Sequence, residues 1–208
     1  MARGATARLF VAVDPPQSVR DQLLAWAQGA ATRLSAQRPK GALGELRVLE
    51  SAALHVTLCF LGSRPVGEIE TIGSALLECD GDVGELEVGA PLWLPPRRPR
   101  ALAVEVHDRG GELTRLQASA TRALTRATGW EAERRRFKAH LTVARTRGRP
   151  SSRRAAATAE PALPATPQVG FTPAAMILYR SWLSRAGASY EPLATYSLGR
   201  ESSSGPPR

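Results

Sequence analysis

Three histidines occur in the 208-residue chain, and two of them are followed at the second position by threonine. The two segments are His55-Val56-Thr57-Leu58 and His140-Leu141-Thr142-Val143, with the histidines 85 residues apart. Because the chain has 14 threonines, two such pairs among three histidines would arise by chance only about 1% of the time. A single His-x-Thr on a strand is more often structural than catalytic, but its repetition favours a functional pair.

Two imidazoles can perform acid-base chemistry together, since near neutral pH one ring can be protonated while the other is neutral. This suits in-line displacement at phosphorus, in which one ring deprotonates an attacking water and the other protonates the departing oxygen. The hydroxyls of Thr57 and Thr142 could bond the non-bridging phosphate oxygens. Residue chemistry alone does not decide whether His55 or His140 is the acid.

A metal centre is not expected from this pattern. Neither motif has an Asp, a Glu or a second His nearby at ligand spacing, and Cys59 and Cys79 do not make a zinc set. We therefore expect neither a metal nor another cofactor. The third histidine, His107, has no matching threonine and is expected on the surface. Cys59 is expected to be a small, half-buried thiol.

Strictly alternating segments carry both motifs. Leu54, Val56, Leu58 and Phe60 would share one face of a strand, and His55 and Thr57 the other, because successive strand side chains point to opposite sides. In the second segment the apolar face is Phe137, Ala139, Leu141 and Val143. Strict alternation points Arg145 to this core face, unless the strand ends or bulges there.

The surrounding elements repeat one plan of strand, helix and His-x-Thr strand. In the first half, Leu9 to Val13 predicts a buried strand, Asp14 an N-cap with Pro15 in the first turn, and residues 19–34 a helix. In the second half, residues 101–106 predict a strand and 113–127 a helix ending at Gly129. We expect a single bilobal α+β domain over residues 1–200, with repeat halves at about 8–95 and 100–198.

Further elements follow from the same reasoning. Residues 65–79 predict a helix, 86–94 a strand, and 174–183 and 190–198 two late strands with Gly187 in the turn between them. Residues 151–167 are expected to be a surface connection with at most a short helix. The tail, residues 201–208, is expected to be disordered.

The net charge of +9 is concentrated in one segment. Residues 134–154 contain nine cationic side chains and no Asp or Glu: Arg134, Arg135, Arg136, Lys138, Arg145, Arg147, Arg149, Arg153 and Arg154. This favours an anionic partner, with nucleic acid ahead of a membrane. No apolar stretch approaches the roughly 18 to 20 residues of a membrane span, so we expect a cytoplasmic protein. The aromatic content of 5% shows no interface patch, which favours a monomer.

The segments 54–62 and 137–145 resemble the paired signatures of the two-histidine phosphoesterases. They are most similar to the bacterial and archaeal RNA 2′,3′-cyclic phosphodiesterases, also described as 2′-5′ RNA ligase-like. Residues 8–14, 178–181 and 190–193 are similar to that group as well, so the resemblance covers most of the chain.

This resemblance implies a bilobal α+β fold, with antiparallel sheets lining a central cleft and helices outside. It also implies hydrolysis of RNA or nucleotide 2′,3′-cyclic phosphate ends to 2′-phosphomonoesters. His55 would be the proton donor and His140 the proton acceptor, while Thr57, Thr142 and Arg145 would bind the phosphate.

Two departures from the family pattern concern substrate contacts. The group usually has a basic residue where this chain has Cys59, and often Arg-Pro where it has Lys138-Ala139. Two alternatives remain open at this stage. One is an RNA 2′-5′ ligase on the same fold, and the other is a non-catalytic module that binds RNA ends.

Overall fold

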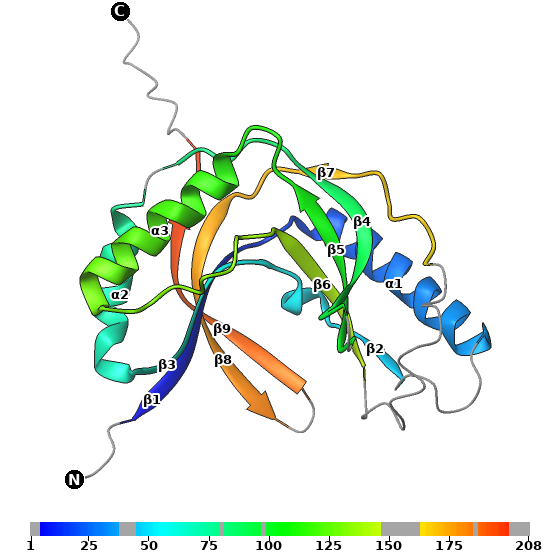
Figure 1. The fold of residues 1–208 in the computed structure, drawn as a ribbon, viewed down its shortest axis with the longest axis horizontal. Coiled ribbons are helices and arrows are strands. Elements are labelled where there is room, and N and C mark those ends of the chain that lie inside the picture. The colour runs from blue at the N-terminus through cyan, green and yellow to red at the C-terminus, as the bar shows by residue number, and fades with distance from the viewer. Residues whose placement is uncertain are drawn as a thin grey trace, which may run out of the picture.

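Antiparallel strands run through the computed structural model, which describes residues 5–37, 45–79, 81–96, 99–146, 163–184 and 187–199 (Figure 1). In chain order the strands are β1 (Thr6–Val13), β2 (Leu46–Val48), β3 (Val56–Pro65), β4 (Leu86–Leu94), β5 (Ala101–His107), β6 (His140–Thr146), β7 (Gly170–Phe171), β8 (Ala175–Ser184) and β9 (Gly187–Ser197). The described residues form one nine-stranded sheet in the order β7-β4-β5-β6-β3-β1-β8-β9, with β2 paired to β6. Together with the helices, this arrangement confirms the predicted α+β class.

The two halves of the chain exchange strands. β1 and β3 share one group with β8 and β9, which come from the end of the chain, whereas β4 pairs with β5 and β2 with β6. The groups meet where β3 pairs with β6, at Val56 opposite Leu141. Each predicted His-x-Thr strand is therefore the innermost strand of its group, and the junction between them lies at the motifs.

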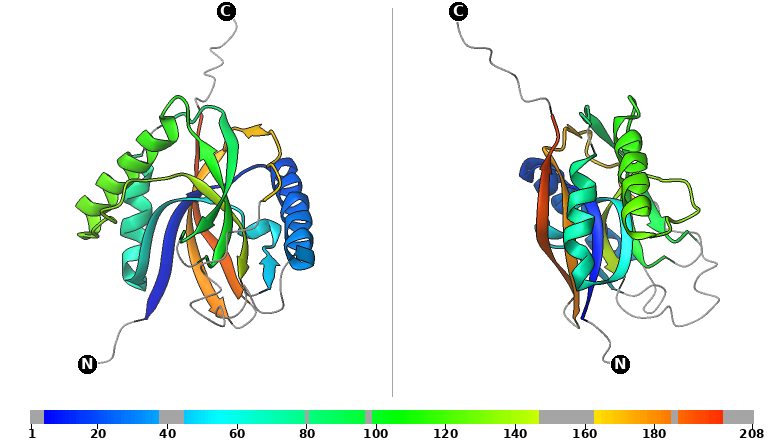
Figure 2. Two further views of the ribbon diagram at one scale, coloured as in Figure 1. Left: turned by 45° about the vertical axis from the view of Figure 1, so that its right-hand side comes forward. Right: turned by 90° about the vertical axis from the view of Figure 1, so that its left-hand side faces the viewer.

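In the described residues three helices cover the sheet, as the 3.6-residue spacing of their apolar residues predicts. They are α1 (Gln17–Gln37), α2 (Ile69–Leu77) and α3 (Glu112–Thr128), and short 3₁₀ turns η1 (Ser51–Ala53) and η2 (Val66–Glu68) precede β3 and α2. α2 and α3 pack against each other, whereas α1 packs on β2 and β6 at the opposite end of the molecule (Figures 1 and 2). None of the helices in the described ranges is long and apolar enough to cross a membrane.

The start of α1 differs from the prediction. The helix begins at Gln17, and the backbone N–H groups of Val19 and Arg20 bond the carbonyl of Pro16. The carboxylate of Asp14 accepts hydrogen bonds from Arg20 and Tyr179 instead of capping the helix. The N-cap prediction was wrong because α1 begins three residues after Asp14, and the carboxylate is bound by Arg20 and by the distant Tyr179.

Several boundaries also differ from expectation. β6 begins at His140, so Phe137 and Ala139 precede the strand and are half-buried. β7 was not predicted, and it contributes only a short pairing with β4. Most of the predicted connection at 151–167 and all of the tail at 201–208 lie outside the described residues.

Candidate active site

The two His-x-Thr segments meet at the β3–β6 junction. Val56 and Leu141 are directly paired and fully buried, so they fix the two strands against the core. Continuing this antiparallel register by one residue places His55 opposite Thr142 and Thr57 opposite His140. Directly opposed side chains have Cβ atoms about 4.5–5.5 Å apart. The fold thus gathers both histidines and both threonines on one face, where all four are half-buried.

Both signature strands bulge at the fourth position of the motif. Between β3 and β1, Thr57 is opposite Ala12 and Cys59 is opposite Val11. Leu58 therefore has no partner in β1 and is the extra residue of the bulge. In β6 the partners in β5 pass from Ala103 opposite Thr142 to Leu102 opposite Ala144, which leaves Val143 as the extra residue. A bulge changes the face of every side chain that follows it.

The bulge in β6 places Arg145, for which strict alternation predicted the core face. Ala144 is fully buried and Arg145 is exposed. Arg145 lines the same hollow as Tyr190, whose ring contacts His55, so it lies on the side of the histidines. In β3 the equivalent positions are Cys59, which is buried, and Phe60, which is exposed.

His55 lies in an aromatic environment built by three strands. Its ring centroid is 4.7 Å from that of Phe10 in β1 and 5.0 Å from that of Tyr190 in β9, which meets it edge-on. Tyr179 in β8 stacks on the other side of this group, with its ring 5.2 Å from Phe10. Burial lowers the pKa of His55 to about 4, so the ring is neutral at pH 7 in the free protein.

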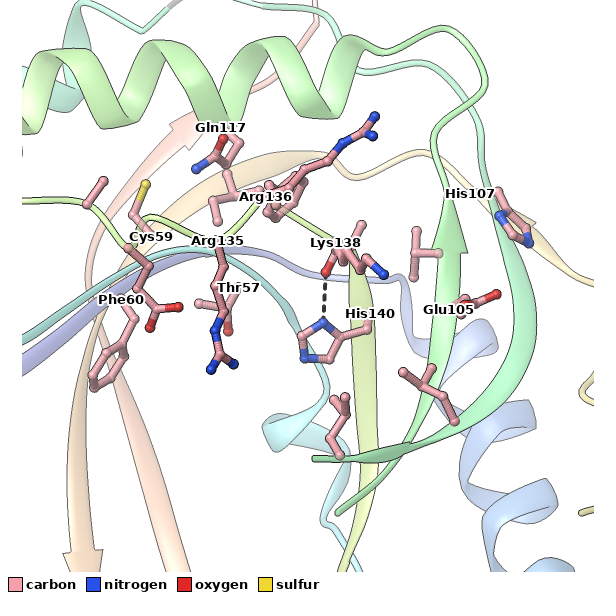
Figure 3. Close-up of a pocket in the computed structure, with 18 of the residues that line it drawn as sticks. Thr57, Cys59, Phe60, Glu105, His107, Gln117, Arg135, Arg136, Lys138 and His140 are labelled. Atoms are coloured by element: carbon pink, nitrogen blue, oxygen red, sulfur yellow. Dashed lines mark hydrogen bonds between the residues drawn. The ribbon is translucent and has the colours of Figure 1, made fainter. Parts of the chain in front are cut away.

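His140 is oriented by the backbone instead. Its Nδ1 atom lies 2.8 Å from the carbonyl oxygen of Lys138 (Figure 3). In a neutral ring, Nδ1–H donates to this carbonyl and Nε2 keeps its lone pair. His140 is therefore held in the tautomer that a general base requires. Because the contact uses the Lys138 carbonyl, the departure from the family pattern at Lys138-Ala139 leaves this bond intact.

A cavity of about 590 Å³ opens beside Thr57 and His140. Its polar and charged lining includes Glu105, Gln117, Glu133, Arg135 and Arg136, and its aromatic lining is Phe60, Trp130 and Phe137 (Figure 3). A smaller hollow of about 320 Å³ is lined by Arg145 and Tyr190, among other residues. Thr57 and His140 therefore line the larger hollow, whereas the smaller one reaches the site through Tyr190, whose ring contacts His55.

The remaining chemical candidates have other roles. Cys59 is buried and its thiol lies 3.4 Å from the Thr121 hydroxyl, and burial raises its pKa to about 11. It is therefore a neutral core thiol at pH 7. His107 is exposed, as expected, and lies at the far rim of the larger cavity. Within the described ranges no three His, Cys, Asp or Glu side chains are gathered in a way that could hold a metal ion.

Sequence reasoning missed the aromatic group and the acidic residues around the histidines. Phe10, Tyr179 and Tyr190 contact one another although they lie up to 180 residues apart in the sequence, and no local pattern brings them together. Of the nine cationic residues predicted as an RNA-binding segment, Arg147, Arg149, Arg153 and Arg154 fall outside the described residues.

Comparisons with known proteins give the following matches. No family model matches the chain. The RNA 2′,3′-cyclic phosphodiesterase of Aeropyrum pernix is 33% identical over 106 residues, which is 50% of this chain and 58% of that protein. The chain thus matches a little over half the length of this relative.

Solved structures share the fold over nearly the whole chain. Escherichia coli LigT complexed with 3′-AMP superposes with a TM-score of 0.73 at 20% identity, covering 94% of this chain and 100% of LigT. The protein TT0787 of Thermus thermophilus superposes with a TM-score of 0.66 at 24% identity, covering 92% and 97% of the two chains.

Proposed function

We propose that the chain is a two-histidine phosphoesterase and, within that family, an RNA 2′,3′-cyclic phosphodiesterase. The observation that carries the proposal is the pairing of β3 with β6, which gathers His55, Thr57, His140 and Thr142 on one face. The name of the Aeropyrum pernix relative supports the same reaction. The substrate is an RNA or nucleotide that ends in a 2′,3′-cyclic phosphate.

The proposed reaction is an in-line displacement. Nε2 of His140 takes a proton from water as the water oxygen bonds to phosphorus, and the bond from phosphorus to the 3′ oxygen breaks. His55 gives its proton to the departing 3′ oxygen, which leaves a 2′-phosphomonoester. The hydroxyls of Thr57 and Thr142 donate to the non-bridging oxygens, where negative charge accumulates, and Arg145 adds a positive charge nearby.

His55 can act as the general acid only if it becomes protonated when the substrate binds. In the free protein burial holds its pKa at about 4, which keeps the ring neutral at pH 7. A cyclic phosphodiester carries a negative charge, and an opposite charge within a few ångströms favours the protonated imidazole. The acid is therefore formed in the complex with the substrate.

The test measures hydrolysis of a 2′,3′-cyclic nucleotide in the presence of a chelator by wild type, His55→Ala and His140→Ala. Each substitution is expected to lower kcat by about 10² to 10⁴-fold, the usual contribution of a general acid or base. His107→Ala removes the exposed third histidine and serves as the matched control. Undiminished turnover in both active-site variants would reject the assignment, and binding of RNA without any turnover would favour a non-catalytic module.

A second candidate is 2′-5′ ligation, which the cavity of about 590 Å³ beside His140 favours. His140 lies on the side from which the nucleophile attacks, so a 5′-hydroxyl carrying a nucleoside could replace water there. Incubation with two defined RNA halves, one ending in a cyclic phosphate and the other beginning with a 5′-hydroxyl, separates the candidates. A longer strand identifies the ligase, whereas a 2′-phosphate alone identifies the hydrolase.

A further inference from the structure

Each of the two histidines has an acidic residue in the adjacent segment of chain. Glu105 in β5 pairs with His140 in β6. In β1, Val13 pairs with Val56, and continuing that register by one residue places Asp14 opposite His55. The two carboxylates therefore occupy equivalent positions relative to the two His-x-Thr motifs.

Their surroundings differ. Glu105 is exposed at the edge of the larger cavity. Asp14 is tied into the fold: its Oδ2 accepts a hydrogen bond from Arg20 at 2.7 Å and another from the Tyr179 hydroxyl at 2.8 Å. The pKa of Tyr179 is raised by burial and by Asp14, so its O–H remains a donor. Arg20 is held in turn by the carbonyls of Pro15 and Ser51.

The second oxygen of Asp14 is the unexplained feature. Oδ1 is buried and accepts no hydrogen bond from the described residues. An unsatisfied buried acceptor costs about 1–3 kcal/mol, and such atoms in native structures often have a functional role. Asp14 thus presents a fixed carboxylate with one open acceptor close to His55.

We propose that Asp14 is the positioning residue of His55, supplying the negative charge and the open acceptor that favour a proton on this ring. The proposal rests on the proposed function, because a proton on His55 matters only if His55 is the acid of the reaction. Asp14 does not touch the substrate and acts through His55.

Asp14 acts on the pKa of His55 in the opposite direction to the other charged groups near the ring. Arg20 on α1 and His140 and Arg145 on β6 all lower the pKa of His55, whereas Asp14, next to β1, raises it. The Tyr179 and Tyr190 side chains, from β8 and β9, complete the surroundings through ring contacts with His55. Without Asp14, the neighbours that remain are cations and burial, all of which disfavour the protonated ring.

The test follows the His55 titration by NMR in the free protein and, separately, the pH dependence of kcat. Asp14→Asn is expected to move the titration midpoint of His55 to lower pH. The fall of kcat at high pH, the basic limb of the profile, should move to lower pH as well, so that in this pH range kcat is at least about threefold lower than in wild type. Asp14→Glu keeps the charge and is expected to restore both. Asp21→Asn removes an exposed carboxylate of the same helix region and is expected to change neither.

A second variant covers the case in which Asp14→Asn does not fold. Arg20→Gln removes a cation that competes for Asp14, so both the His55 midpoint and the basic limb are expected to move to higher pH. A His55 titration that is unchanged in either variant overturns the proposal, even if the enzyme is active. If wild type hydrolyses no cyclic phosphate, the proposed function fails, while the NMR titration still decides the role of Asp14.

Discussion

At the scale of single residues, two identical side chains in equivalent positions of the two motifs have different surroundings. His55 is enclosed by Phe10 and Tyr190, and burial disfavours its charged form. His140 is half-buried, and the Lys138 carbonyl selects its tautomer. Pairs of titratable groups whose environments differ in this way are typical of acid-base sites. Because burial keeps His55 neutral at pH 7 in the free protein, its proposed role as proton donor depends on the negative charge of a bound substrate.

The depressed pKa of His55 makes stability depend on pH. The pKa falls from 6.5 to about 4 on folding, so below pH 6.5 the unfolded chain binds a proton that the folded chain does not. The contribution of His55 to the free energy of unfolding is fully present above about pH 6.5 and is lost as the pH falls towards 4. The full change is about 3 kcal/mol. Urea denaturation of wild type and His55→Gln at pH 7 and pH 4.5 measures this. An equal loss in both proteins would contradict the prediction.

At the scale of elements, the signature strands were predictable because alternation is local, but the bulges were not. Leu54 to Phe60 and Phe137 to Val143 show the period of two that identifies a half-buried strand. The extra residues Leu58 and Val143 are defined only by the registers with β1 and β5, which no local pattern contains. For the same reason, the sequence could name Arg145 as a candidate but could not place it.

Helix α3 ends at Gly129, as its sequence predicts, and the backbone at this glycine can be tested by substitution. This residue has φ 63° and bonds the Thr125 carbonyl through its N–H at 3.0 Å. A Cβ there would meet no atom within 4 Å, so Gly129→Ala costs only the left-handed backbone strain, about 1 kcal/mol.

The matched control is Gly29, inside α1, where a Cβ also meets no atom within 4 Å. Gly29→Ala is expected to stabilise the protein by about 0.5–1 kcal/mol, because alanine is the better helix former. Chemical denaturation of the two variants should therefore give free energies of unfolding that change in opposite directions. A change of the same sign in both would refute the backbone explanation.

At the scale of the whole molecule, strand exchange and charge together determine where an RNA would lie. β8 and β9 join the strand group of the first histidine and bring Tyr179 and Tyr190 to it, while β4 pairs with β5 in the group of the second histidine. The halves of the sequence are thus not separate in space, and this topology could not be deduced from the repeat alone. The described cations Arg135 and Arg136 line the larger cavity beside His140.

The basic segment should therefore control RNA affinity through salt-dependent contacts. Replacing Arg134, Arg135 and Arg136 together by Gln is expected to weaken binding of single-stranded RNA equally for all sequences. Because each lost phosphate contact of a single strand lowers the slope of log affinity against log salt by about 0.7, the slope should fall by up to about 2. Fluorescence anisotropy between about 50 and about 200 mM salt measures the slope.

The matched control for this prediction removes three exposed arginines elsewhere, Arg33, Arg115 and Arg126. It changes the net charge of the protein by the same amount but leaves the segment beside His140 intact. If RNA binding depended only on overall charge, both triple variants would show the same loss of RNA affinity and the same decrease in the slope of log affinity against log salt. A local role for the segment requires that the Arg134, Arg135 and Arg136 variant lose more of the slope than the control, since counterions are released only where arginine meets phosphate.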